Sequence, residues 1–266
     1  MGGMLGAFIA VLDIQITNSS LQEIQAALGA TIEEGSWIST AYLVAEVVVI
    51  PLTGWLSQVF SVRRYLLVNT TLFIFFSICC AWSVNLPMMI VFRGLQGLSG
   101  SILIPMALTI VLMTLPPAKQ PIGMAMFAIT ATFSPSSGLT LGGWLTDNLG
   151  CQYNFYLNIT PGILMLSAIA YTIPAQPLQL NLLKGGGWWG ILTMTIGLAS
   201  LEVVLEEVNR KDWFSSQEIS QLAVVAFAFL SAFLWIELTR KRPYINLPLL
   251  LRITLGLVLL QVLPWD

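Results

Sequence analysis

Three charged side chains stand inside long apolar stretches of this sequence, and they are the residues best suited to chemistry. Asp13 lies in LDIQITN (Leu12–Asn18), Glu46 follows AYLVA, and Arg93 lies in FRGLQGLSG (Phe92–Gly100). A guanidinium stays protonated, so a buried arginine needs a carboxylate or carbonyl partner. A buried carboxyl group beside an arginine can change protonation after a small movement. The pattern therefore predicts either proton transfer or an ionic contact that only joins helices.

Helical spacing places further polar and small residues beside two of these charges. Residues one turn apart share a helix face, which brings Thr17 next to Asp13. The chain contains no histidine, so a carboxyl group, Asp13 or Glu46, must carry the proton if proton transfer occurs. Small residues let helices approach closely. The face of Arg93 carries one polar residue and two glycines: Gln96, Gly97 and Gly100.

Two other carboxylates are expected at the surface. Glu202 lies close to a polar loop and can reach water from there. Glu237 precedes Lys241 by one helical turn, a spacing that favours a surface ion pair. Neither is predicted to take part in chemistry.

The cysteine and glycine patterns exclude several classes of site. The chain has 3 cysteines, an odd number without ligand spacing, so neither a disulfide framework nor a zinc site is expected. The glycines at 185–187 precede an apolar run, whereas a nucleotide-binding loop follows a strand. We therefore predict that the protein is not an enzyme, holds no cofactor and binds no nucleic acid.

The composition places most of the chain in a bilayer. Of the 266 residues, 56% are hydrophobic and 9% are charged, whereas a soluble domain carries about 25% charged residues. A helix needs roughly 20 apolar residues to cross the hydrocarbon core. Eight runs suffice, and a ninth begins near Ile253 and is expected to be incomplete at Asp266. The eight are Met4–Leu21, Ser36–Ser57, Tyr65–Val84, Pro87–Met113, Ile122–Thr146, Phe155–Ile173, Trp188–Leu205 and Ile219–Leu238.

These runs predict an all-α polytopic membrane protein of four parts. Residues 1–174 form a six-helix bundle, 175–187 a cytoplasmic linker, 188–240 two additional helices, and 241–266 a cytoplasmic loop with the start of the ninth helix. Basic residues gather in inner loops of membrane proteins. A cytoplasmic N-terminus leaves only Arg210 and Lys211 outside. It places inside Arg63, Arg64, Lys119, Lys184, Arg240, Lys241, Arg242 and Arg252.

The motifs resemble those of the major facilitator superfamily, specifically its fourteen-helix drug:proton antiporter branch, the EmrB/QacA type. LDIQITN is similar to the first-helix motif, with Asp13 and Asn18 in place, and FRGLQGLSG is similar to the fourth-helix motif. SPSSGLTLGG (Ser134–Gly143) and FYLNITPG (Phe155–Gly162) resemble the motifs of helices five and six. The region from Trp188 resembles the two extra helices of that branch.

The resemblance implies a proton-driven efflux transporter in the cytoplasmic membrane, where the proton gradient supplies the energy. Its substrates would be small lipophilic or cationic molecules. In a host with two membranes, its partners would be a periplasmic adaptor and an outer-membrane channel. Proton coupling or the substrate cavity would involve Asp13, Asn18, Glu46, Arg93 and Gln96. Gating and helix packing would involve Gly54, Arg63, Arg64, Gly97, Gly100, Pro135, Gly138, Gly142 and Gly143.

The chain departs from the family pattern in two motifs and in length. In the loop after helix two, Gln58, Val59 and Ser61 replace an acid, a base and a glycine, which changes the expected gating contacts. In helix five, Leu139 replaces a proline, so a kink there is not expected. The length corresponds to the N-terminal part of a fourteen-helix transporter. Two alternatives therefore remain: a truncated protein without transport, or a half-transporter that needs a partner.

Overall fold

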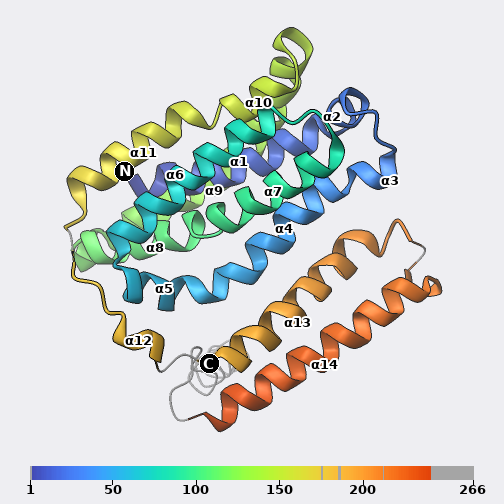
Figure 1. Cartoon of the computed structure of the whole chain (residues 1–266). Helices are drawn as coiled ribbons and strands as arrows, with labels where there is room; N and C mark the ends of the chain where they lie inside the picture. The colour runs from blue at the N-terminus through green and yellow to red at the C-terminus, as the bar shows by residue number, and fades with distance from the viewer. Residues whose placement is uncertain (1, 175, 185–186, 212, 241–266) are drawn as a thin grey trace, which may run out of the picture.

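The first six predicted runs fold into a bundle of helices that surrounds the first helix. The computed structural model describes residues 2–174, 176–184, 187–211 and 213–240 (Figure 1). Every regular element in these ranges is a helix. Helix α1 (Gly2–Ser19) is followed by α2 (Leu21–Ala27) at an angle of 62°. The second span contains α3 (Ile32–Gly35), α4 (Trp37–Val49), η1 (Ile50–Leu52) and α5 (Thr53–Phe60).

The remaining helices follow the predicted order with short interruptions. The bundle continues with α6 (Val62–Ala81), α7 (Leu86–Gly100), α8 (Leu103–Thr114), η2 (Pro117–Lys119), α9 (Gln120–Leu149), α10 (Gln152–Tyr156) and α11 (Ile159–Thr172). The chain then forms α12 (Asn181–Lys184), α13 (Trp188–Glu207), η3 (Trp213–Ser215) and α14 (Gln217–Thr239). The expected ninth helix lies outside the described residues.

Not every predicted run is apolar enough to count as a membrane span by itself. Within the described ranges, 6 helical segments are long and apolar enough, and α1 with α2 gives 7 if the bent pair is one span. Helix α9 is 30 residues long but is not among them. Serine, threonine and glycine between Ser134 and Gly143 lower its hydropathy. These residues are also the ones that α9 uses to approach α1.

Small residues allow α9 and α7 to lie against their neighbours at very short range. A side chain at Gly138 would meet Gln15 Cβ at 2.8 Å, and one at Gly142 would collide with Ser19 of α1. The Ser134 hydroxyl donates to the Phe8 carbonyl at 2.8 Å. Helix α9 runs through Pro135 without a break. Close contact between these backbones therefore replaces apolar side-chain packing.

Close contact with a neighbouring helix accounts for four of the six glycines that the sequence assigned to gating and helix packing. A side chain at Gly97 would collide with the Tyr42 carbonyl, and one at Gly100 would approach Phe73 at 3.0 Å. At Gly54 and Gly143 an added Cβ meets nothing within 4 Å among the described residues. The close-packing explanation therefore does not extend to these two positions in the described part of the chain, because spacing on a helix does not reveal which face meets a neighbour.

Helices α13 and α14 form a hairpin that is joined to the bundle through α4. The two helices pack along each other, and α13 also contacts α4 (Figure 1). The main apolar core lies elsewhere, between α1, α4, α6, α8 and α11, and includes Ile9, Tyr42, Phe73, Met106 and Met165. The hairpin therefore meets the bundle along its second span, mainly at α4, which also borders the centre, with a further ring contact between Trp188 and Trp55 of α5.

The turn between α5 and α6 contains a strained serine. Ser61 adopts φ 70°, ψ 134°, which glycine tolerates much better than other residues. The side chain is 2% exposed, and its hydroxyl has no hydrogen-bond partner in the described part of the chain. Ser61 stands where the family pattern has glycine, so the structure explains that pattern in terms of backbone conformation.

We predict that Ser61→Gly stabilises the protein by about 1 kcal/mol, because it removes both the strain and the unpaired hydroxyl. Thermal unfolding in detergent, followed by circular dichroism, measures the change. Ser57→Gly is the matched control within α5 and should destabilise by about 0.5 kcal/mol, because glycine is the poorer helix former. Equal losses in both variants would contradict the strain at Ser61.

Candidate functional site

A buried ion pair between α1 and α7 lies at the centre of the bundle. Arg93 Nη1 is 2.7 Å from Asp13 Oδ2, and each side chain is 1% exposed. Asp13 occupies the α1 face that also buries Leu12 and Ile16. The sequence named both residues, and the structure brings them together across 80 positions of chain. A pair so well shielded from water interacts more strongly than a surface pair.

The pair belongs to a closed hydrogen-bond network. Gln96 donates to the second Asp13 oxygen, Oδ1, at 3.1 Å and accepts from Arg93 Nη1 at 2.9 Å. Asn158 also donates to Asp13 Oδ1, at 2.5 Å. Both carboxylate oxygens of Asp13 are therefore satisfied, so the negative charge is compensated by one cation and two amides.

Two members of this network were not predicted as site residues. Asn158 lies between α10 and α11, and its amide also donates to the Ser77 hydroxyl of α6 at 3.0 Å. Ser77 in turn donates to the Phe155 carbonyl at 2.8 Å. The asparagine in the apolar FYLNITPG stretch could have indicated a member of the network, because a buried amide needs hydrogen-bond partners. Ser77 gave no such signal, since serine often bonds to its own helix.

Aromatic rings line the guanidinium on the sides that the network leaves open. The Tyr42 ring of α4 has its centroid 4.3 Å from Arg93 Cζ, and the Phe155 ring lies at 5.9 Å. Such contacts favour a cation over the ring faces. Arg93 Nε has no hydrogen-bond partner among the described residues. The arginine is thus held by one carboxylate, one amide oxygen and two rings, while its Nε donor has no partner in the described part of the chain.

Glu46 lies beside this network without joining it. Its side chain on α4 is buried, at 5% exposure, and Oε1 has no hydrogen-bond partner in the described ranges. It is within electrostatic reach of Asp13 and Arg93, and of Glu202 on α13. A buried carboxyl group without a hydrogen-bond partner is costly, and it is a natural place for a proton or a cation to bind.

Several other predicted residues lie away from the network. Asn18 is exposed and accepts from the Ser39 hydroxyl at 2.8 Å, so it does not share the environment of Asp13. Arg63 donates to the Ala170 carbonyl at 2.8 Å, which ties α6 to α11. Arg64 is exposed. The structure therefore reduces the central cluster to Asp13, Glu46, Arg93 and Gln96 of the residues named from sequence.

The expectation for Glu237 is corrected. The side chain is only 2% exposed and lies near Gly190 of α13, so it is not at the surface. Its expected partner Lys241 lies outside the described residues. The i,i+4 spacing indicated a shared face with Lys241 but not that this face of α14 packs on α13. Glu202 is half-buried, so the expectation that its carboxylate reaches water is met only in part.

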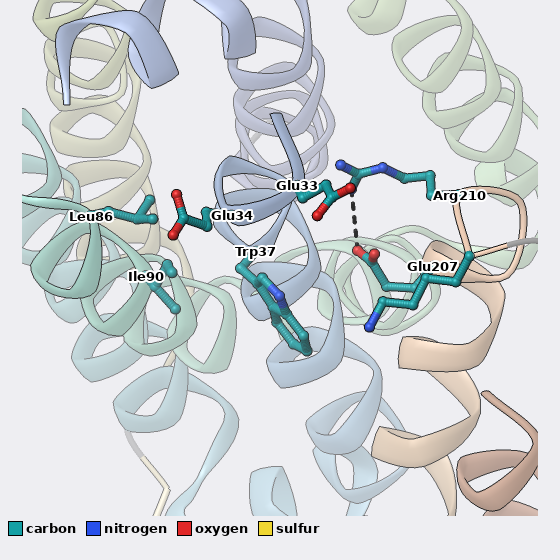
Figure 2. Close-up of a pocket in the computed structure, with 8 residues that line it drawn as sticks. Glu33, Glu34, Trp37, Leu86, Ile90, Glu207 and Arg210 are labelled. Carbon is teal, nitrogen blue, oxygen red and sulfur yellow. Dashed lines mark hydrogen bonds and ion pairs between the residues drawn. The ribbon is translucent and has the colours of Figure 1, made fainter. Parts of the chain in front are cut away.

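A second polar site lies where α13 ends, beside the start of α4, and Figure 2 shows it. Glu207 is 4% exposed and accepts from Ser36 at 3.1 Å and from Thr40 at 3.3 Å. Arg210 contacts the same Glu207 oxygen at 3.3 Å and donates to the Ile32 carbonyl at 2.7 Å. Sequence reasoning did not find Glu207, because an acid next to a polar loop is usually solvated.

This polar site borders a pocket of about 380 Å³ (Figure 2). Most charges around the pocket are already paired: Glu207 with Arg210, and Lys211 with Glu218 at 2.5 Å. The Glu34 carboxylate accepts from the backbone amide of Thr31 at 3.1 Å and from the Thr31 hydroxyl at 2.9 Å. The lining residues are Glu33, Glu34, Trp37, Leu86, Ile90, Glu207, Arg210 and Lys211.

The central network can store and release one charge. As long as Asp13 is ionised, it neutralises Arg93. A proton on Asp13 would remove that attraction and free the guanidinium to seek another partner. Among the described residues, no group of three or more histidine, cysteine, aspartate or glutamate side chains is placed to hold a metal ion.

We predict that Asp13→Ala destabilises the protein by about 3 to 5 kcal/mol, because it leaves the buried Arg93 charge uncompensated. The double variant Asp13→Ala/Arg93→Met should recover much of that loss, since no lone charge remains. Thermal unfolding in detergent of Asp13→Ala, Arg93→Met and the double variant, each compared with the wild type, gives the three values of the cycle. Asp147→Ala, which removes an exposed acid of α9, serves as the control and should leave the midpoint unchanged. Additive effects of the two substitutions would contradict a coupled pair.

Comparisons with known proteins agree with this architecture. The Major Facilitator Superfamily profile matches residues 3–265. The chain is 34% identical to "Colistin resistance protein EmrB" of Acinetobacter baumannii and 33% identical to "Multidrug export protein EmrB" of Escherichia coli K12. It is 32% identical to "Fatty acid resistance protein FarB" of Neisseria gonorrhoeae. Each match covers 92% of this chain and 48% of the relative, so the chain spans about half the length of these proteins.

Solved structures show the same fold. A D-xylose-proton symporter superposes with a TM-score of 0.55 at 14% identity, over 89% of this chain and 66% of the symporter. A bacterial homologue of the human lysosomal transporter Spinster gives a TM-score of 0.53 at 14% identity, over 92% of this chain and 63% of that protein. The helices, their order and the match over nearly the whole sequence lead to one conclusion: this multi-pass membrane protein belongs to the Major Facilitator Superfamily, a family of transporters rather than enzymes, and is related to EmrB-type multidrug exporters.

Proposed function

We propose that this chain is the N-terminal part of a proton-coupled exporter of amphipathic small molecules in the cytoplasmic membrane. The observation that carries the proposal is the Asp13–Arg93 pair, 1% exposed and closed by Gln96 and Asn158. Ionisable residues within a membrane bundle are costly and usually serve transport. A chain that only needed to join α1 to α7 could do so with apolar or small residues, as α9 does.

In this proposal the pair exchanges partners when a proton arrives. Protonation of Asp13 neutralises the carboxylate, and Arg93 is then attracted to the remaining buried acid within reach, Glu46. Gln96 bonds to both Asp13 and Arg93, so it would follow the change. The two arrangements differ in the positions of α1, α4 and α7. Coupling requires that proton and substrate prefer different arrangements, since a ligand shifts an equilibrium only by its difference in affinity.

The proposed substrate class is inferred from the names of the relatives. Their names refer to colistin, to multiple drugs and to fatty acids, which share an apolar part and a charged or polar part. We carry this class to the present chain as small lipophilic or cationic molecules. In a host with two membranes, the partners would include a periplasmic adaptor and an outer-membrane channel.

The domain and topology assignments complete the proposal. Residues 1–174 would form the transporter bundle, 175–187 the cytoplasmic linker, and 188–240 the additional hairpin. The N-terminus would be cytoplasmic, which places the Glu207 site outside. Gly54, Arg63, Arg64, Pro135 and Gly143 keep a gating role in this proposal, and Asn18 keeps a role at the substrate cavity, although all of them lie outside the central network.

The proposal is tested by substrate-driven proton movement in inverted membrane vesicles that contain the chain. With an imposed proton gradient and a pH-sensitive dye, addition of a lipophilic cation such as ethidium should release protons from the vesicle lumen. Asp13→Asn and Arg93→Lys should reduce this signal by about tenfold or more, because a displaced catalytic or binding group costs at least that much. Lys119→Gln removes a charge outside the network and should leave the signal intact. Normal coupling in Asp13→Asn would contradict the assigned role.

A second candidate function follows from the coverage of the relatives. Because the chain spans about half of them, it could act as a half-transporter that needs a partner, or as a membrane protein without transport. Antibodies against the peptide 206–218 would reveal the size of the cellular product beside a recombinant 29.1 kDa standard. A product of about twice that mass supports a complete exporter, whereas a product of equal mass favours the second candidate.

A further inference from the structure

A groove on the surface of α6 lies apart from the Asp13–Arg93 network and shares no residue with it. Its volume is about 420 Å³, within the range of roughly 300 to 1,000 Å³ that is usual for small-molecule sites. Most of the lining is apolar, and the charged group at its edge is a guanidinium. The lining residues are Phe60, Arg64, Tyr65, Val68, Asn69 and Leu178.

The guanidinium of Arg64 is available for a ligand. Its side chain is exposed, and it makes no ion pair and no side-chain hydrogen bond with the described residues. The neighbouring Arg63 is engaged by the Ala170 carbonyl. Asn69 uses its amide on the Tyr65 carbonyl at 2.9 Å. At position 58, where the family pattern has an acid, this chain has glutamine, so a carboxylate partner is also missing from that position.

An apolar stripe leads from Arg64 along the membrane-facing side of α6. Val68, Leu72 and Phe75 are 57%, 39% and 56% exposed, and their spacing from Arg64 keeps all four on one helix face. Phe75 follows Arg64 by 11 positions, which corresponds to a rise of about 16 Å along the helix. That length is close to the hydrocarbon depth of one leaflet, about 15 Å. The stripe therefore runs from a cation at one membrane boundary to the bilayer centre.

The groove has a second wall from a distant part of the sequence. Leu178 belongs to the segment after α11, and Gln179 N–H donates to the Val59 carbonyl at 2.9 Å. This bond fixes the segment against the turn between α5 and α6. The site is thus a groove between two chain segments, where a ligand would contact both.

We propose that this groove binds a phospholipid with an anionic headgroup, with the phosphate on Arg64 and an acyl chain along Val68, Leu72 and Phe75. Charge complementarity selects the headgroup, since the groove offers a guanidinium and no carboxylate among its lining residues. The apolar stripe selects a lipid over a free phosphate. Because Leu178 forms one wall, the bound lipid also holds the segment after α11 against α5 and α6. This inference does not depend on proton coupling.

Native mass spectrometry of the purified chain in detergent tests the proposal. The protein is incubated with equal amounts of dioleoyl-phosphatidylglycerol and dioleoyl-phosphatidylcholine, which differ in headgroup charge but not in acyl chains. We expect the anionic lipid to be retained about fivefold more than the zwitterionic one, the factor that one basic side chain gives at an anionic surface. Arg64→Gln should bring the ratio to about one, whereas Arg64→Lys should retain a clear preference.

The matched control is Lys119→Gln, which removes one exposed positive charge elsewhere and should keep the wild-type ratio. Equal retention of both lipids by the wild type would overturn the proposal without any variant. A preference that survives Arg64→Gln would place the site elsewhere, and one that is lost equally in Lys119→Gln would reduce it to general electrostatic attraction. Circular dichroism confirms the helix content of each variant before the lipids are compared.

Discussion

The structure depends on keeping one ion pair out of water. Asp13 and Arg93 are almost completely buried, and either charge alone would be strongly unfavourable in this environment. The helices that surround the pair must therefore supply polar partners at fixed positions: α7 gives Gln96, and the α10–α11 junction gives Asn158. Gly97 lets α4 approach until the Tyr42 ring covers the guanidinium. The close packing of α4 on α7 thus brings an aromatic ring to the charge pair, while the side chains of Asp13 and Arg93 bridge α1 and α7.

The carboxyl groups of Asp13 and Glu46 lie in different environments. Asp13 has both oxygens occupied by donors, whereas Glu46 on the neighbouring helix has an oxygen without any donor in the described part of the chain. Both are buried and both lie near the same arginine. One carboxylate is thus stabilised and the other is not, although they belong to one electrostatic system. In the proposed function, this asymmetry would offer Arg93 a second carboxylate to bind when Asp13 is protonated.

The sequence predicted the helices and the charged pair, but only part of what surrounds them. Long apolar runs indicate helices that lie in lipid, so the order of the helices could be predicted from the sequence. Asp13 and Arg93 were identified because charged residues are rare inside such runs. Asn158, Ser77 and Glu207 were missed, since their partners on other helices are from 78 to 171 residues distant and ordinary polar residues carry no sign of such contacts. Gly54 and Gly143 show the opposite limit: they follow the same motif pattern as the packed glycines, but within the described residues no neighbour lies within 4 Å of an added Cβ at either position. Long-range contacts decide these cases, and they depend on the rotation of each helix.

The position of the additional hairpin follows from the same physics. Apolar contacts between helices gain little in a bilayer, because lipid tails are equally apolar, so polar contacts and close packing determine which helices associate. The buried Glu207 of α13 accepts from Ser36 and Thr40, at the start of α4, and Arg210 reaches the Ile32 carbonyl of α3. These contacts lie on the same span that carries Tyr42 and Glu46 beside the central pair. Any rearrangement of α4 around Arg93 must then either carry α13 and α14 with it or break a buried polar cluster, and the first is far less costly. The hairpin is thereby coupled to the central pair through the second span, which contains α3, α4 and α5.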